Sequence, residues 1–283
     1  MIELIAALAM MADPAGAIAQ QARGRVGVSA QILETGKTVV GLNAREKFPM
    51  QSVYKLPIAM AALAEVDRGK LKLDQVVHVD QSEYISAGQH SPLRDQNPGG
   101  ADVALRELLR LAVMESDGTA SDVVMRLTGG PAAVMQHLTS IGVHDVNVRD
   151  TEMDLGHDWS TQYKNWATPE AAVSVLRAVQ ESRGLSASSH ELLMKFLTES
   201  TSFPTRIKGL LPSGTVVAHK TGSSGERNGI AAATNDIGIV TLPDGRHLAI
   251  AVFVSDSRAE SAVRDRVIAK IAREAWDRAG RKR

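Results

Sequence analysis

The chain has 283 residues, and its 44% hydrophobic and 23% charged residues are the mixture found in globular proteins that bury a sizeable core. The formal net charge is +0, which argues against the basic surface that nucleic-acid binding requires. Cysteine is absent, so disulfides, thiol nucleophiles and thiolate metal ligands are excluded. The eight histidines form no H-x-H or H-E-x-x-H pair, which argues against a zinc hydrolase.

The first segment of the chain allows two interpretations. Residues 2–12 are apolar apart from Glu3, and residues 17–19 (AIA) resemble the cleavage site of a secretory signal, although no basic residue precedes Arg23. Alternatively, residues 13–14 (Asp-Pro) cap a helix of the folded protein, with proline at its first position. The apolar run is too short to span a bilayer.

The predicted elements begin with a β-hairpin, because β-branched runs at 26–33 and 37–42 flank a turn at 34–36. Apolar residues three and four apart then predict helices at 54–68, 103–115, 119–128, 131–140, 168–181 and 189–199. Strands return at 214–221, 229–240 and 246–255, with a turn at 243–245 between the last two. An amphipathic helix is predicted at about 258–279.

Strands at both ends with helices between them predict an α/β (α+β) fold. We expect one antiparallel, five-stranded sheet that both ends of the chain build and that helices flank. The α/β domain would be discontinuous, with residues 1–45 and 201–283, and an all-helical domain of residues 46–200 would be inserted into it.

Ser52 and Lys55 form an S-x-x-K motif at the predicted start of a helix. Residues three apart share a helix face, so the lysine amine can reach the serine hydroxyl and accept its proton. Free backbone N–H groups at a helix start also favour a developing oxyanion. Pro57 supports this placement, because proline is tolerated only near the beginning of a helix. An isolated S-x-x-K is more often a surface serine and lysine.

Ser116, Asp117 and Gly118 lie between two helical patterns. A loop there can point the Ser116 hydroxyl into a cleft, where it can pass a proton to a leaving nitrogen. Taken alone, Ser-Asp-Gly-Thr is more typical of a helix N-cap.

Lys220, Thr221, Gly222 and Ser223 end a predicted strand. A lysine and two hydroxyls at a strand edge can hold a substrate carboxylate, and the backbone N–H groups of Ser223 and Ser52 can form an oxyanion hole. The alternative is an edge strand protected by a solvated lysine.

Glu152 lies in a polar, irregular segment, residues 150–158. A carboxylate there can act as a general base that activates water, and Asp150 and Asp154 are weaker candidates for the same role. Alternatively, Glu152 is a solvated loop glutamate.

The order S-x-x-K, S-D-G and K-T-G resembles the established motif set of class A β-lactamases and penicillin-binding proteins. Longer stretches make the resemblance specific to class A β-lactamases from about residue 25 to 278, and closest to their PER/VEB-type extended-spectrum branch. These stretches are residues 46–55 (EKFPMQSVYK), 66–71 (VDRGKL), 162–166 (QYKNW), 208–222 (KGLLPSGTVVAHKTG) and 232–240 (AATNDIGIV).

The resemblance implies an active site in the cleft between the two domains. It implies hydrolysis of the β-lactam ring of penicillins and cephalosporins through an acyl-serine intermediate, giving antibiotic resistance. Ser52, Lys55, Ser116 and Glu152 would be catalytic, and Asp117, Gly118 and residues 220–223 would bind the substrate. It further implies a periplasmic or secreted monomer that acts on small molecules and needs no metal or organic cofactor.

The chain departs from the family pattern at three places. Gly118 replaces an asparagine that contacts the substrate amide, and Gly156 replaces an asparagine that helps to hold the hydrolytic water. No arginine follows Lys220 in a convincing alignment for carboxylate binding, because the register of Arg227 looks wrong; Arg206 is the substitute we consider.

Gly118 and Gly156 leave open an inactive or very slow member of the family. Two related functions also remain as alternatives, a D,D-peptidase and a β-lactam sensor domain, both of which acylate and then deacylate slowly. Glu152 and the lack of a membrane-spanning run argue against them. Whether Lys55 or Glu152 activates Ser52 stays open, as it does for the family.

Overall fold

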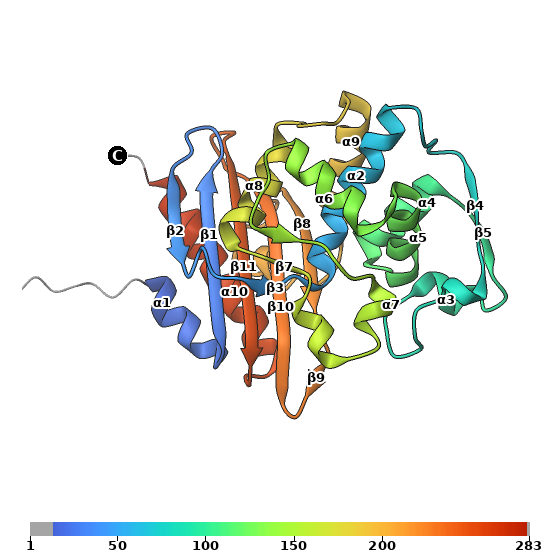
Figure 1. The fold of residues 1–283 in the computed structure, drawn as a ribbon. Helices are drawn as coiled ribbons and strands as arrows, with labels where there is room; N and C mark the ends of the chain where they lie inside the picture. The colour runs from blue at the N-terminus through green and yellow to red at the C-terminus, as the bar shows by residue number, and fades with distance from the viewer. Residues whose placement is uncertain (1–13, 282–283) are drawn as a thin grey trace, which may run out of the picture.

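The computed structural model describes residues 14–281, and its main feature is an antiparallel sheet built from both ends of the chain (Figure 1). The strand order is β2-β1-β11-β10-β8, and a short strand β9 pairs with β10. The bounds are β1 Arg25–Ile32, β2 Thr38–Leu42, β8 Val217–Ser223, β9 Glu226–Arg227, β10 Ile230–Thr241 and β11 His247–Ser257. The predicted α/β class and antiparallel sheet are confirmed.

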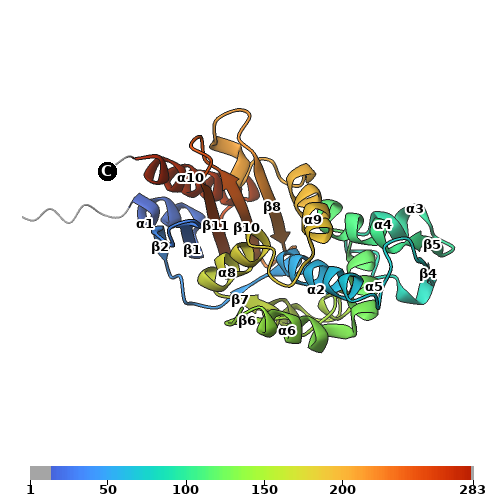
Figure 2. The ribbon, with the colours of Figure 1, turned by 90° about the horizontal axis from the view of Figure 1, so that it is seen from above.

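The two faces of this sheet belong to two hydrophobic clusters. Along β11, Ile250 and Val252 face one cluster, whereas Ala251 and Phe253 face the other, because successive strand residues point to opposite sides. Helices α1 (Pro14–Ala19) and α10 (Ser261–Gly280) cover the first face (Figure 2). Helix α8 (Pro169–Gln180) covers the second, where the sheet shares its core with the helical part of the chain.

Helix α2 (Lys55–Asp67) runs through the centre of the helical part. It packs against α5 (Gly118–Thr128), α6 (Gly130–Ser140) and α9 (Ala187–Glu199), and most of its side chains are therefore buried. Helix α4 (Leu105–Arg110) packs on α5. The predicted helix over 103–115 was wrong at its start, because Ala101–Ala104 form strand β5, which pairs with β4 (Val76–Val79).

Several short elements were not predicted. A small sheet joins β3 (Phe48–Pro49), β7 (Trp166–Ala167) and β6 (Val146–Asn147). Helices α3 (Pro92–Gln96) and α7 (Glu152–Leu155) have one turn each, and the segment Leu111–Glu115 after α4 is a π-helical turn. These elements lie close to the site described below.

The N-terminal prediction is settled in part. Residues 17–19 belong to α1, whose Ala15 and Ala19 side chains are buried, so the folded-helix interpretation holds from residue 14 onward. Residues 2–12 and Asp13 lie outside the described part of the chain. Within residues 14–281, no helix has the length and apolar character needed to cross a membrane.

Candidate active site

Ser52 lies in the 3₁₀ turn Gln51–Tyr54, which leads directly into α2. The preceding residue, Gln51, has a left-handed φ of 48°, a conformation that costs a non-glycine residue about 1–3 kcal/mol. A hydrogen bond of 2.6 Å from Gln51 Nε2 to Gln162 Oε1 helps to hold this turn. Ser52 is thus presented from a fixed, strained corner of the backbone.

The end of strand β8 lies against this corner. A Cβ added at Gly222 would lie 2.5 Å from the Met50 carbonyl oxygen and 3.1 Å from the Val53 nitrogen, so only glycine permits the approach. Asn235 on β10 strengthens it, because its Nδ2 donates to the carbonyl oxygens of Pro49 (2.8 Å) and Met50 (3.0 Å). We did not predict Asn235, although a polar residue within an apolar strand was a signal for it.

Lys55 is buried behind the Ser52 turn, with 1% of its side chain exposed. Its Nζ donates to the Ser116 carbonyl oxygen at 2.6 Å and lies 3.1 Å from Glu152 Oε1. The lysine therefore contacts a residue from each of the two other predicted catalytic segments.

Ser116 joins Lys55 to Lys220. The residue has a left-handed φ of 61° between the π-helical turn and α5. Its carbonyl oxygen accepts from Lys55, and its Oγ accepts from Lys220 Nζ at 2.9 Å. The structure thus brings together Lys55, Ser116, Glu152 and Lys220, which the sequence separates by up to 165 positions.

Lys220 is buried on the edge strand β8, with 1% exposure, so it is not a solvated edge lysine. Burial lowers its pKa well below the usual value, and the positive charges of Lys55 and Arg206 act in the same direction. The negative charges of Glu152 and Asp236 oppose this shift only in part.

Glu152 is the first residue of α7, and its backbone is tied to Asp122 on α5. The nitrogens of Glu152 and Met153 donate to the two carboxylate oxygens of Asp122 at 2.7 and 2.9 Å. Burial, and the charge of Glu152, raise the pKa of Asp122 to about 7. Sequence patterns gave no signal for this role, because thirty residues separate Asp122 from Glu152.

The two rival carboxylates have other partners. Asp154 accepts from the backbone nitrogen (2.9 Å) and the hydroxyl (2.8 Å) of Thr151, which lowers its pKa and closes the N-terminal turn of α7. Asp150 lies 3.6 Å from Arg149 and 3.8 Å from Lys164. Glu152 is the carboxylate of this segment that contacts Lys55.

A pocket of about 330 Å³ lies beside Ser52. It is lined by Ser52, His90, Glu115, Ser116, Ser202, Phe203, Thr221, Gly222 and Ser223. The sequence analysis missed four of these residues, namely His90, Glu115, Ser202 and Phe203, which lie in segments without a recognisable motif. Of the predicted site residues, Ser52, Ser116, Thr221, Gly222 and Ser223 line this pocket, whereas Lys55, Glu152 and Lys220 are not among its lining residues.

Comparison with known proteins identifies the family of this chain. The profile of the β-lactamase enzyme family matches residues 11–279. The chain belongs to the β-lactamase enzyme family. Among curated relatives, the extended-spectrum β-lactamase PER-1 of Pseudomonas aeruginosa is 42% identical over 235 residues, 83% of this chain and 76% of that protein. β-Lactamase VEB-1 of the same organism is 38% identical over 243 residues, 85% of this chain and 81% of that protein.

Solved β-lactamase structures share the fold. A β-lactamase from Chitinophaga pinensis is 45% identical, with a TM-score of 0.90 over 94% of this chain and 98% of that chain. A class A β-lactamase from Bacteroides cellulosilyticus is 31% identical, with a TM-score of 0.87 over 94% and 95% of the two chains. The predicted resemblance to class A and to its PER/VEB-type branch is confirmed.

The structure does not bring every predicted site residue of this β-lactamase to the pocket. Asp117 is fully buried, and its oxygens accept from Leu93 N (2.6 Å), Ala120 N (2.8 Å) and Ser91 Oγ (3.0 Å). It therefore caps α5, as the local sequence favoured. Gly118 is buried in the first turn of α5 and is not among the residues that line the pocket.

Arg206 lies beneath β8 with 1% exposure. Its guanidinium donates to Asp265 Oδ1 (2.7 Å), to the Asn235 carbonyl oxygen (2.9 Å) and to Ser223 Oγ (2.7 Å). It thus supports the strand end and contacts three residues that line the pocket, through bonds to Ser223 Oγ and the Gly222 carbonyl oxygen (3.2 Å) and by stacking on the Phe203 ring. Arg227 is exposed on β9.

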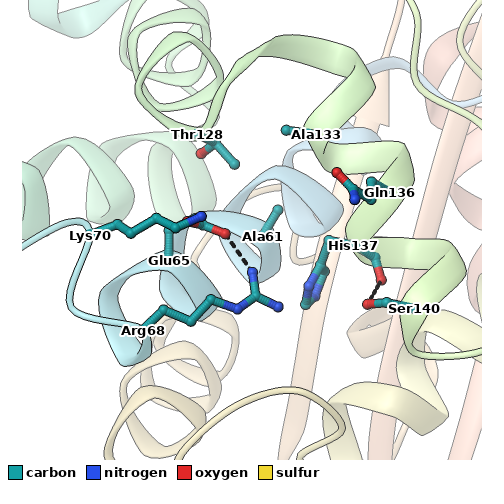
Figure 3. Close-up of a pocket in the computed structure, with 9 residues that line it drawn as sticks. All are labelled: Ala61, Glu65, Arg68, Lys70, Thr128, Ala133, Gln136, His137 and Ser140. Atoms are coloured by element: carbon teal, nitrogen blue, oxygen red, sulfur yellow. Dashed lines mark hydrogen bonds and ion pairs between the residues drawn. The ribbon is translucent and has the colours of Figure 1, made fainter.

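A second pocket, of about 290 Å³, lies between α2 and α6 (Figure 3). It is lined by Ala61, Glu65, Arg68, Lys70, Thr128, Ala133, Gln136, His137 and Ser140, none of which belongs to the site around Ser52. Within the described residues, no three His, Asp or Glu side chains are grouped so that they could hold a metal ion.

Proposed function

We propose that this β-lactamase opens the β-lactam ring of penicillins and cephalosporins through an ester on Ser52, and thereby gives antibiotic resistance. The observation that carries the proposal is the convergence of Lys55, Ser116, Glu152 and Lys220 beside the pocket that Ser52 borders. The family membership and the named relatives support the same reaction.

In the first step, Ser52 Oγ attacks the carbonyl carbon of the ring as its proton leaves to a base. Lys55 and Glu152 lie 3.1 Å apart, so either can be that base and can then pass the proton to the other. The carbon–nitrogen bond then breaks, and the Ser116 hydroxyl protonates the ring nitrogen. Lys220 Nζ, at 2.9 Å from Ser116 Oγ, stabilises the oxygen that loses its proton, and the proton taken from Ser52 then passes to Ser116 Oγ, so that both bases are free for the next step.

In the second step, Glu152 takes a proton from water as the water oxygen attacks the ester carbonyl. The carbon–oxygen bond to Ser52 breaks, Ser52 Oγ regains a proton, and the product leaves with a new carboxylate. The backbone N–H groups of Ser52 and Ser223 are proposed to stabilise the oxyanion in both steps. The fixed approach of Gly222 to the Ser52 turn supports this pairing.

Substrate binding is assigned to the strand end. Lys220, Thr221 and Ser223 are proposed to hold the substrate carboxylate, since Thr221 and Ser223 line the pocket and Lys220 supplies its charge. Arg206 supports this arrangement through its bond to Ser223 Oγ. Asp117 and Gly118 act on binding through the position of α5 and not through direct contact.

The pocket takes residues from both parts of the chain, which supports a cleft between the helical domain (46–200) and the α/β domain (1–45, 201–283). We further propose a monomer that works in the periplasm or outside the cell. Light scattering and cell fractionation test these two points.

The deciding experiment compares the native enzyme with Ser52→Ala on a chromogenic cephalosporin. The native enzyme should turn over continuously, and a slow substrate should leave its adduct on the peptide that contains Ser52, as detected by mass spectrometry. Ser52→Ala should fold normally and hydrolyse nothing. Continued turnover by Ser52→Ala would reject the nucleophile. A native enzyme that is acylated once and stalls would favour the D,D-peptidase or sensor function.

A further inference from the structure

Two glycines lie beside Glu152 although their backbone conformations do not require glycine. Gly156 has φ −74° and ψ −18°, values that any residue adopts in a helix. Gly118 lies in the first turn of α5 and is absent from the residues with positive φ. Turn geometry therefore does not account for either glycine.

Side chains from one loop, residues 85–90, fill the space next to both glycines. A Cβ added at Gly156 would lie 2.5 Å from Gln89 Oε1 and 3.0 Å from Gln89 Cδ. A Cβ added at Gly118 would lie 2.3 Å from Ile85 Cδ1 and 3.4 Å from the Cβ and Cγ atoms of Glu152. Ile85 thus fills the space at the start of α5, and Gln89 fills the space at the end of α7.

The amide of Gln89 is fixed at both of its atoms. Its Nε2 donates to the Glu152 carbonyl oxygen at 2.5 Å, an oxygen that also accepts from the Gly156 nitrogen at 3.2 Å. Its Oε1 accepts from Ser86 N (3.2 Å) and from Ser86 Oγ (2.9 Å). The Ser86 bonds therefore orient the amide so that its N–H group points at the backbone of Glu152.

The loop itself is held in place by Arg94. The guanidinium of Arg94 donates to the carbonyl oxygens of Ile85 (3.1 Å), Ser86 (2.5 Å) and Gln89 (3.0 Å). In addition, the Gly118 nitrogen donates to the His90 carbonyl oxygen at 3.0 Å, which ties the loop to α5. Gln89 thus projects from a loop whose carbonyl oxygens accept hydrogen bonds from Arg94 and Gly118.

We propose that Gln89 is a positioning residue for Glu152 in the deacylation step, an inference that rests on the general-base role assigned to Glu152 above. Helix α7 has only four residues, so its orientation depends on partners outside it. Asp122 holds the Glu152 N–H and Gln89 holds the Glu152 carbonyl, so the residue is fixed at both ends of its backbone. This keeps its carboxylate near Lys55 and the ester.

The first test replaces Gln89 by methionine, which has a similar length but offers no amide. Acylation and deacylation rates are measured separately by rapid mixing with a chromogenic cephalosporin. Deacylation should slow about tenfold, the size expected for one hydrogen bond, while acylation changes less than about twofold. Ser86→Ala, which removes one partner of Gln89 Oε1, should give a smaller loss of deacylation alone. Equal losses in both steps would reject the inference, because it assigns Gln89 to the deacylation step.

The second test uses Gly156→Ala, whose new methyl must displace the Gln89 amide. Gly156→Ala should therefore slow deacylation as Gln89→Met does, and the double variant should be no slower than either single one. Additive losses would overturn the inference. Glu152→Ala is measured in parallel. If it stalls as an acyl-enzyme while Gln89→Met deacylates normally, only the positioning role fails; if Glu152→Ala turns over normally, the proposed base itself is rejected.

Discussion

Lys55 Nζ and Glu152 Oε1 lie 3.1 Å apart, and only 1% and 12% of the two side chains are exposed. The groups proposed for the two chemical steps are therefore direct neighbours in a site shielded from water. Removal of one partner leaves the other charge buried without compensation, which usually destabilises a protein. A substitution at either position consequently has to be assessed for folding as well as for activity.

The first prediction follows from this contact. Glu152→Gln keeps the shape and the polar contact to Lys55 but cannot accept a proton. With Lys55 still present to take the Ser52 proton, the variant should acylate and then stall. We expect a burst of about one equivalent of product and a fall in steady-state kcat of about 100- to 10,000-fold. Glu152→Ala should behave in the same way but melt at a lower temperature, because Lys55 loses its partner. Steady turnover by a folded Glu152→Gln would contradict the assignment.

The second prediction concerns Lys220, whose pKa is lowered by burial and by neighbouring positive charges. A carboxylate binds the protonated amine, so kcat/KM should fall as the pH rises through this lowered pKa. Lys220→Arg stays charged throughout, so its decline should move to higher pH. Rate measurements from pH 5 to pH 10 test this shift, and identical basic limbs in the two proteins would contradict it.

Lys220→Ala removes the charge entirely. The loss in kcat/KM for carboxylate-bearing β-lactams should correspond to a loss of transition-state stabilisation of about 1.5–3 kcal/mol, the usual contribution of a hydrogen bond to a charged group. Unchanged kinetics would leave Lys220 as a structural residue of β8.

The third prediction concerns the stability of variants at Gly118, which lies in the first turn of α5. Because an added Cβ meets Ile85 Cδ1 at 2.3 Å, Gly118→Ala and Gly118→Asn should each lower the stability by about 1–3 kcal/mol, as overpacked sites do. Ile85→Val removes the very atom that is met, so Gly118→Ala/Ile85→Val should recover much of the loss. Thermal unfolding of the four proteins measures this coupling, and a stable Gly118→Ala single variant would disprove the overlap.

The sequence predicted the chemistry better than the connections that hold it. Ser52 and Lys55 are three residues apart, and the K-T-G residues end an apolar strand, so local patterns were sufficient to select them. Asn235 and Gln89 act through contacts with residues 185 and 63 positions away, which no local pattern contains. The contacts of Asp117 are those of a helix N-cap, as the local sequence predicted, whereas the family resemblance implied that Asp117 binds the substrate.

Fold prediction shows the same limit. Periodicity of the apolar residues predicted the main strands and the long helices, because a strand buries apolar residues on one face and a helix buries them along one stripe. The helix predicted from residue 103 began too early in the sequence, because pairing with Val76–Val79 overrode the helical tendency of Ala101–Ala104. The one-turn helix α7 depends on a capping box of Thr151 and Asp154 and on Asp122, and so lacks the apolar period that reveals longer helices.

The last prediction concerns His137, which is 5% exposed on α6 beside the second pocket (Figure 3). Neither ring nitrogen has a hydrogen-bond partner among the described residues. Burial lowers the pKa of His137 below its usual 6.5, and the charge of Arg68 lowers it further, although Glu65 opposes the effect. The neutral ring is therefore the form that the folded protein holds.

Because the pKa of His137 is lower in the folded state than in the unfolded state, the unfolded chain binds more protons as the pH falls below about 6.5. The contribution of His137 to the free energy of unfolding should thus be fully present above that pH and decline below it. The decline should have a slope of up to about 1.4 kcal/mol per pH unit. His137→Gln should flatten the decline, whereas His144→Gln, at an exposed histidine, should not. Urea unfolding between pH 5 and pH 8 tests this, and parallel curves for the native protein and His137→Gln would show that His137 does not titrate on unfolding.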